Sequence, residues 1–199
     1  LLRALNTPKD PYIPSIKPGM NFDINSLDKE RTDLTALLKQ RGFYNLTKES
    51  FRFQVDTTND NLKANVILKV RPEISGNDSI ANRILSRKKI SNITFLMTTT
   101  ERTQAYAAGV PRENREKMDS LWYNGYRFLF NNKLVISGKS LISNTFIFPN
   151  TYYNDKMVEE TYAALNALPP VKYVNVVFRE RPDNQLDCII VITPDKNQS

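Results

Sequence analysis

Residues 19–44 constrain the fold most, because their pattern of loop, amphipathic helix and glycine stop has a partner later in the chain. An offset of 131 residues aligns Pro18 with Pro149 and Phe22 with Tyr153. The same offset aligns the apolar positions of the two helices, which are Leu27 with Val158, Leu34 with Leu165 and Leu37 with Leu168. A helix pattern that recurs in register indicates two copies of one supersecondary unit.

Both ends of the first helix are specified by the sequence. Asn25 or Ser26 supplies an N-cap oxygen, and Asp28 and Glu30 are expected in the first turn, where acidic side chains complement the helix dipole. Gly42 suits the left-handed conformation that often ends a helix. One face carries the apolar residues Leu27, Leu34, Leu37 and Leu38. This stripe must be buried, and a sheet is expected to receive it.

A β-hairpin follows the first helix. Residues 51–55 alternate apolar and polar side chains, residues 56–61 have turn composition, and residues 62–70 form the return strand. Two strands under one helix make a marginal sheet, so a third strand is expected upstream of Leu1. The helical composition of residues 1–5 is consistent with a truncated first helix.

The second unit repeats this order around an insertion. Residues 90–97 supply its opening strand, Asn154 caps its main helix, and residues 174–178 and 186–192 form the final hairpin. The insertion is expected to hold a helix over 112–121 and a hairpin of 126–130 with 134–136, and a short turn or helix start is expected at 140–142. The predicted domains are residues 1–72, a linker at 73–88 with a helical turn near 80–85, and residues 89–199 with the insertion 98–138.

Composition excludes many kinds of site. The chain has no histidine, which removes histidine-based catalysis and histidine-ligated zinc, and it has one cysteine, Cys188, which is expected in the core. Phosphate-binding glycine loops are absent. The net charge of +7 is diffuse, so nucleic-acid binding is not predicted. An enzyme using carboxylates alone stays as an alternative, with Asp28, Glu30, Glu159 and Glu160 as its acids.

The repeated unit resembles the POTRA domain, the periplasmic module of BamA and TamA proteins. The resemblance rests on the order of helix, glycine–aromatic stop and hairpin. It uses Pro18, Gly19, Phe22, Asp23, Leu27, Glu30, Arg31, Leu34, Leu38, Gly42, Phe43 and Tyr44, and then Tyr153, Val158, Thr161, Tyr162, Leu165 and Leu168. It implies an α+β fold of two tandem β-α-α-β-β modules, each a small mixed sheet with helices on one face. The first module lacks its opening strand, and the segment 193–199 is similar to the one joining the last module to the barrel.

The resemblance also implies a function. It points to a non-enzymatic scaffold on the periplasmic side of the outer membrane, without cofactor or metal, attached to a C-terminal transmembrane barrel. The implied partners are unfolded outer-membrane proteins and accessory assembly proteins, and nucleic acid is not among them. Whether the role is BamA-like insertion or TamA-like export stays open.

The candidate binding residues lie on the first strand of each hairpin, which is expected at a sheet edge. An open edge accepts an extended peptide through backbone hydrogen bonds. Two alternatives stay open: a rigid spacer whose edges are closed internally, the second by the 126–136 hairpin, and an adaptor without a barrel. The candidate residues are Phe51, Phe53, Gln54 and Val55 in the first unit and Val174, Asn175, Val176 and Phe178 in the second.

Overall fold

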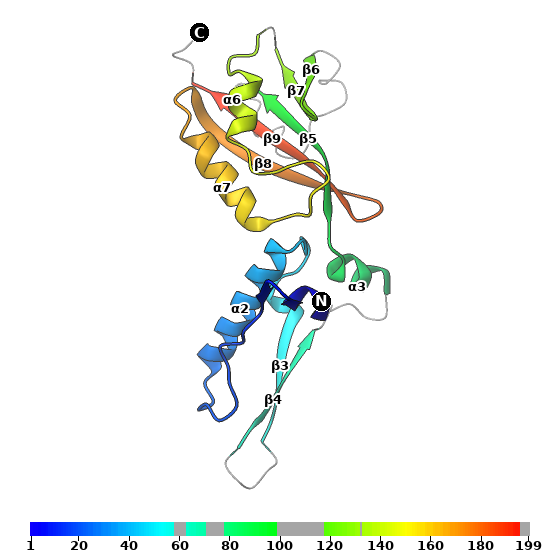
Figure 1. The fold of residues 1–199 in the computed structure, drawn as a ribbon, viewed down its shortest axis with the longest axis vertical. Coiled ribbons are helices and arrows are strands. Elements are labelled where there is room, and N and C mark those ends of the chain that lie inside the picture. Colours follow the sequence, from blue (N-terminus) through cyan, green and yellow to red (C-terminus); the bar gives the residue numbers. More distant parts are fainter. Residues whose placement is uncertain (58–62, 71–77, 99–117, 132, 196–199) are drawn as a thin grey trace. The chain divides into compact units, whose positions relative to one another are not determined.

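The computed structural model describes residues 1–57, 63–70, 78–98, 118–131 and 133–195. The chain forms two compact units, Leu1–Arg87 and Lys88–Ser199 (Figure 1). Each unit combines helices with a small sheet, so the predicted α+β fold class is confirmed. Within the described ranges, no helix is long and apolar enough to cross a membrane.

The first unit contains a two-stranded antiparallel sheet, β3–β4, beside the long helix α2. Phe51 pairs with Val70 at one end of this sheet and Asp56 pairs with Asn65 at the other. No third strand among the described residues pairs with it. The elements are α1 (Leu2–Leu5), β1 (Asn6–Thr7), β2 (Asp10–Pro11), α2 (Ile24–Gln40), η1 (Lys48–Ser50), β3 (Phe51–Asp56), β4 (Asn65–Val70) and α3 (Asp78–Leu85).

The core of the first unit lies where α2 meets the start of β3. It consists of Leu34, Leu38, Phe43, Leu46 and Phe51, each at most 3% exposed. Residues Ile84 and Leu85 pack against this cluster. They belong to α3, which matches the helical turn predicted near 80–85, so that part of the predicted linker contributes to the first core.

Helix α2 begins earlier than predicted. Its N-cap is Asp23, whose carboxylate accepts hydrogen bonds from the backbone N–H groups of Asn25 and Ser26, each at 3.1 Å. The choice of Asn25 or Ser26 as cap was therefore wrong, because Asp23 satisfies the first orphan donors itself. The predicted stop is confirmed: Gly42 has φ +105°, and the N–H of the residue after it, Phe43, donates to the carbonyl of Leu38 at 3.1 Å.

The second unit contains a mixed five-stranded sheet in the order β6-β7-β5-β9-β8. Strand β5 is parallel to both of its neighbours, and the outer pairs are antiparallel. Helices α6 and α7 lie along one face of the sheet (Figure 1). The elements are β5 (Lys89–Met97), β6 (Asp119–Tyr123), β7 (Tyr126–Phe130), α6 (Gly138–Ser143), α7 (Asp155–Asn166), β8 (Val171–Arg181) and β9 (Gln185–Pro194).

The repeat is visible at the second helix. Asn154 caps α7 as predicted, accepting from the N–H groups of Lys156 at 3.0 Å and Met157 at 3.3 Å. Asn154 and Asp23 are related by the same offset of 131 residues that defines the sequence repeat. The aromatic residues before the helices differ, since Phe22 is 52% exposed whereas Tyr153 is 5% exposed. The cap and the apolar stripe therefore repeat, while the packing of the preceding aromatic does not.

The insertion differs from the prediction. Strand β7 (126–130) pairs with the preceding β6 and not with residues 134–136, so the predicted hairpin was wrong. Asn124 and Gly125, with φ of 48° and 80°, form the tight turn between the strands. The helix predicted over 112–121 was also wrong at its end, because residues 119–121 lie in β6, and its remainder up to residue 117 falls outside the described residues.

Both faces of the second sheet are apolar near its centre. On the helix-covered face, the Phe95 and Phe128 rings stack with centroids 5.1 Å apart, and Cys188 is fully buried, as expected from the sequence. Burial raises the pKa of the Cys188 thiol. On the opposite face, a second cluster is formed by Leu96, Leu129, Ile189 and Val191 with Met118 and Val177.

Candidate functional site: the edge strands

The candidate residues of the second unit lie on a strand at the end of the sheet. Val174, Asn175, Val176 and Phe178 all belong to β8, which pairs with β9 on one side. No strand among the described residues pairs with the other side, which we call the outer edge of β8. The alternative in which the 126–136 hairpin closes this edge is contradicted, because β7 pairs with β5 at the far side of the sheet.

The direction of the backbone groups on β8 follows from one hydrogen bond. The N–H of Val176 donates to the hydroxyl of Tyr162 at 2.7 Å, so it does not point toward β9. In an antiparallel pair, alternate residues direct both backbone groups toward the partner or away from it. The outer edge is therefore formed by the backbone of Val174, Val176 and Phe178, and Asn175 faces β9.

Tyr162 covers the middle of the outer edge. It lies on α7, and its hydroxyl donates to the side-chain oxygen of Asn175 at 3.1 Å while accepting from the Val176 N–H. One side chain thus satisfies the central donor of an edge that pairs with no other described strand. In the sequence, Tyr162 stands out only as one of the residues that carry the POTRA resemblance, and no local pattern reveals its contact with a strand that follows the helix.

The second half of β8 is held against the start of α7. The Phe178 and Tyr153 rings meet edge to face with centroids 5.2 Å apart. The Tyr153 hydroxyl donates to the Asp155 carboxylate at 2.5 Å. One face of β8 is therefore packed against α7, and this packing holds the outer edge of the strand in place.

The four candidates of the first unit do not share one environment. Phe51 is 1% exposed and belongs to the core, so its side chain is not available to a partner. Phe53 and Val55 are half-buried, and Gln54 is exposed. Strand β3 pairs with β4 alone among the described strands. Any binding there would use the backbone of β3 and the exposed side of Gln54.

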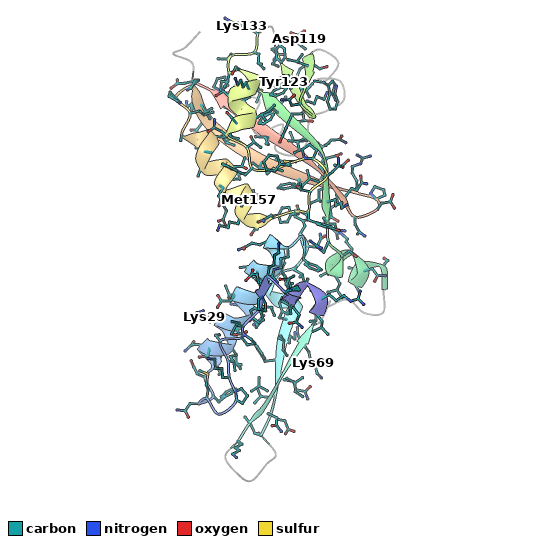
Figure 2. The ribbon with its side chains drawn as sticks, viewed as in Figure 1. Lys29, Lys69, Asp119, Tyr123, Lys133 and Met157 are labelled. Atoms are coloured by element: carbon teal, nitrogen blue, oxygen red, sulfur yellow. The ribbon has the colours of Figure 1, made fainter. Side chains whose placement is uncertain are left out.

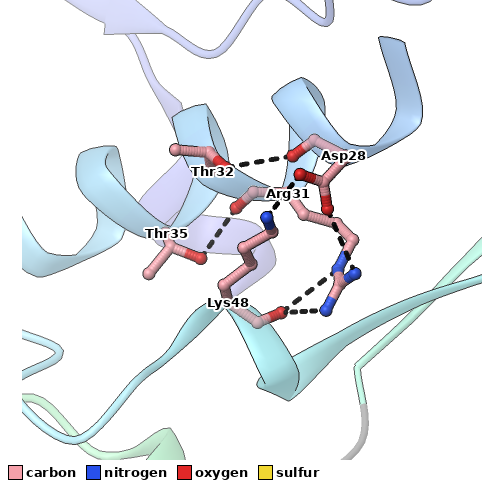
Figure 3. A network of polar contacts seen from close by, with 5 residues as sticks. All are labelled: Asp28, Arg31, Thr32, Thr35 and Lys48. Carbon is pink, nitrogen blue, oxygen red and sulfur yellow. Dashed lines mark hydrogen bonds and ion pairs between the residues drawn. The ribbon is translucent and has the colours of Figure 1, made fainter. Parts of the chain in front are cut away.

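A polar network fixes the start of β3 to α2 (Figure 3). The Arg31 guanidinium donates twice to the carbonyl of Lys48, from Nη2 at 3.0 Å and from Nε at 3.3 Å. Asp28 pairs with Arg31 at 3.5 Å and also with the Lys48 ammonium. These contacts hold Lys48, in the short helix η1 just before β3, against α2, and they give Asp28 a structural role.

Glu30 has a different role from the one predicted. It is 4% exposed and lies in the second turn of α2, so it is too far along the helix to complement the N-terminal dipole. It accepts hydrogen bonds from the Tyr12 hydroxyl and from the hydroxyl and backbone N–H of Ser15, the last at 2.9 Å. Its carboxylate anchors the loop that precedes the helix.

The described residues offer little catalytic chemistry. They contain no group of three or more acidic, cysteine or histidine side chains placed to hold a metal ion. Among the acids considered for an enzyme, Asp28 and Glu30 are engaged in the contacts above. Glu159 is exposed and Glu160 half-buried on α7, and neither lines the hollow described below.

Comparisons with known proteins concern the fold. No family model matches the chain, and no curated protein matches it in sequence. Among solved structures, BamA from Haemophilus ducreyi lacking POTRA domains 1–3 is similar with a TM-score of 0.50 at 11% identity, over 91% of this chain and 25% of that one. POTRA1-3 of Omp85 from Anabaena aligns at 11% identity with a TM-score of 0.41, over 93% of this chain and 61% of that one.

The likeness to BamA extends over both units but concerns a fraction of the larger protein. This chain spans a quarter of the length of the Haemophilus ducreyi chain. At 11% identity such a likeness establishes the fold alone. The protein is thus an α+β chain of two POTRA-like units, with the fold of the corresponding quarter of that BamA chain.

Proposed function

We propose that the chain is a non-enzymatic scaffold of an outer-membrane protein assembly or translocation machine of the BamA or TamA type. In this proposal it lies on the periplasmic side of the outer membrane, belongs to a protein with a C-terminal transmembrane barrel, and binds unfolded outer-membrane proteins or accessory assembly proteins. The fold likeness to BamA supports the setting. The observation that carries the binding role is the unpaired outer edge of β8.

Binding would occur by strand addition at this edge. A client segment in extended conformation would pair with the outward backbone groups of Val174 and Val176, and Tyr162 would yield the Val176 N–H to a client carbonyl. Backbone hydrogen bonds depend little on the client's side chains. This chemistry suits clients that share strand character and differ in sequence.

Proline at Val174 tests the proposal. The alternation along β8 turns the Val174 N–H outward, so proline there removes an edge donor and keeps the ladder with β9. We expect a strand-forming client peptide to shift the amide NMR resonances of β8 in the natural chain, and Val174→Pro to weaken this binding several-fold. Asn175→Pro is the contrasting variant, because its N–H faces β9 and its loss should destabilise the unit.

Unchanged peptide affinity in a folded Val174→Pro variant would contradict strand addition at β8. The same holds if the peptide shifts resonances elsewhere and leaves those of β8 in place.

The second candidate function is a rigid spacer that does not bind clients. The Tyr162 contact favours it, because this contact satisfies the edge donor internally. Tyr162→Phe separates the two functions. If β8 accepts client strands, freeing the Val176 N–H should raise peptide affinity, whereas a spacer should bind no peptide with either side chain.

A further inference from the structure

We infer that the second unit binds a carboxylate carried beside an apolar group, in a hollow of about 290 Å³ on the sheet face opposite the helices. Strand pairing builds its walls. Trp122 of β6 lies opposite Arg127 of β7, and Arg127 lies opposite Thr94 of β5. The hollow differs from the outer edge of β8 in place and chemistry, so this inference does not rest on the proposed function.

Arg127 carries an unused donor. Its Nε is buried and has no hydrogen-bond acceptor in the part of the chain that the structure describes. Its guanidinium carbon lies 5.9 Å from the centre of the Trp122 ring, and this cation–π contact orients the guanidinium group. A buried donor without a partner is costly, and a carboxylate is the group that a guanidinium binds best with two parallel hydrogen bonds. Because Nε is closed to solvent, binding requires the guanidinium to turn into the hollow, where a ligand oxygen at Nε would remove this cost.

The surrounding charge also favours an anion. Arg179 lines the hollow from β8, three strand spacings from β7, or about 14 Å at about 4.8 Å per step. Asp187 is the one carboxylate in the described lining, and it already accepts from Asn92 at 3.1 Å and pairs with Arg181 at 3.3 Å. The remaining positive charges of Arg127 and Arg179 stand on either side of the hollow.

The size and the floor of the hollow define the ligand class. A volume of about 290 Å³ is at the lower end for ligand sites and takes one or two residues of a peptide. The floor contains Leu96, Leu129 and Ile189, and the Trp122 ring, 60% exposed, forms one wall. A carboxylate next to an aromatic or aliphatic side chain fits both parts. The carboxylate is that of a peptide C-terminus or of an acidic side chain.

Trp122 makes the test direct, because it is the only tryptophan in the chain. We would titrate the full chain with N-acetyl-Ala-Phe as free acid, with its C-terminal amide, and with N-acetyl-Glu-Phe amide, and follow tryptophan fluorescence. We expect a saturable change with the free acid and at least tenfold weaker binding of the Ala-Phe amide. Binding of the Glu-Phe amide as tightly as the free acid would assign the carboxylate to an acidic side chain, and weak binding would assign it to a C-terminus.

Matched variants locate the site. Arg127→Gln should weaken binding at least tenfold, and Arg179→Gln several-fold. Lys133→Gln removes the same charge from an exposed position beyond β7 (Figure 2) and should leave affinity within twofold. If Arg127→Gln does not fold, as judged by circular dichroism, Arg179→Gln carries the comparison. Val174→Pro at the β8 edge should leave binding of the carboxylate peptide unchanged. The two variants therefore distinguish failure of this inference from failure of the proposed function.

Three results would overturn the inference. The first is equal binding of the Ala-Phe acid and its amide. The second is loss of affinity with Lys133→Gln equal to that with Arg127→Gln, which would indicate attraction by net charge alone. The third is displacement of the peptide by inorganic phosphate at equal concentration, which would leave no role for the apolar floor.

Discussion

Glu30 shows how one side chain can connect a loop to a helix. It is buried, and it is the acceptor for Tyr12 and Ser15, which lie in the loop before α2. Its neighbour Lys29 is solvent-exposed and pairs with Asp33 on the helix surface (Figure 2). Of these two adjacent charged residues, Glu30 holds the loop to the helix, whereas Lys29 makes a surface ion pair only weakly coupled to stability.

We predict that Glu30→Ala destabilises the first unit by about 1–3 kcal/mol, because it leaves the Tyr12 hydroxyl and Ser15 groups without their acceptor. Lys29→Ala is the matched control and should stay within about 0.5 kcal/mol. The measurement is thermal or urea unfolding followed by far-ultraviolet circular dichroism. Equal stability of the two variants would show that the Glu30 contacts add nothing net.

At the scale of elements, the β6–β7 hairpin is the clearest departure from the expected module. It adds two strands beside β5, so the strand that would otherwise end the sheet becomes central. The Asn124-Gly125 pair that makes this possible is a local signal, and it was available in the sequence. Residues 134–136 form a competing apolar segment after β7, and the wrong hairpin follows from pairing that segment with residues 126–130.

The turn gives a second prediction. Gly125→Ala should destabilise the second unit by about 1–2 kcal/mol, because φ is +80° at this position and a side chain is strained there. The cost arises from the backbone alone, since the nearest atom to the added carbon would be Pro149 Cγ at 3.7 Å. Asn124→Gly, which keeps a residue suited to positive φ, should cost less than about half as much. Unfolding followed by Trp122 fluorescence measures both.

Features that depend on contacts between neighbours in the chain were predictable from the sequence, whereas features that depend on contacts between distant residues were not. Helices α2 and α7, the β3–β4 and β8–β9 hairpins, the Gly42 stop and the Asn154 cap depend on neighbours in the chain, and periodicity and capping chemistry were enough for them. The Tyr162 contact with β8, the burial of Glu30 and the pairing of Trp122, Arg127 and Thr94 across strands depend on the tertiary fold. The strand carrying the candidate site was therefore predictable, but the side chain that covers its edge was not.

For the whole molecule, the division into two units predicts separable unfolding. Trp122 reports on the second unit alone, whereas circular dichroism reports on both. Arg31→Gln should lower the free energy of unfolding of the first unit by about 1–2 kcal/mol, because it loosens Lys48 from α2. Arg31→Lys should not restore this stability, because an ammonium cannot donate the two parallel hydrogen bonds that the guanidinium makes to the Lys48 carbonyl. We expect the dichroism transition to move while the Trp122 transition stays. A joint shift would show that the units unfold together.

The hydroxyl of Tyr162 has a consequence for selectivity among clients. It is tethered beside the Val176 N–H, so it competes with any incoming carbonyl at an effective concentration on the order of millimolar or above. A short or irregular segment that offers a single hydrogen bond gains nothing by displacing it. A longer extended segment gains several bonds for the loss of one. The tyrosine would thus make affinity at the β8 edge depend on client length: short segments would bind weakly, and segments long enough to form a strand would bind.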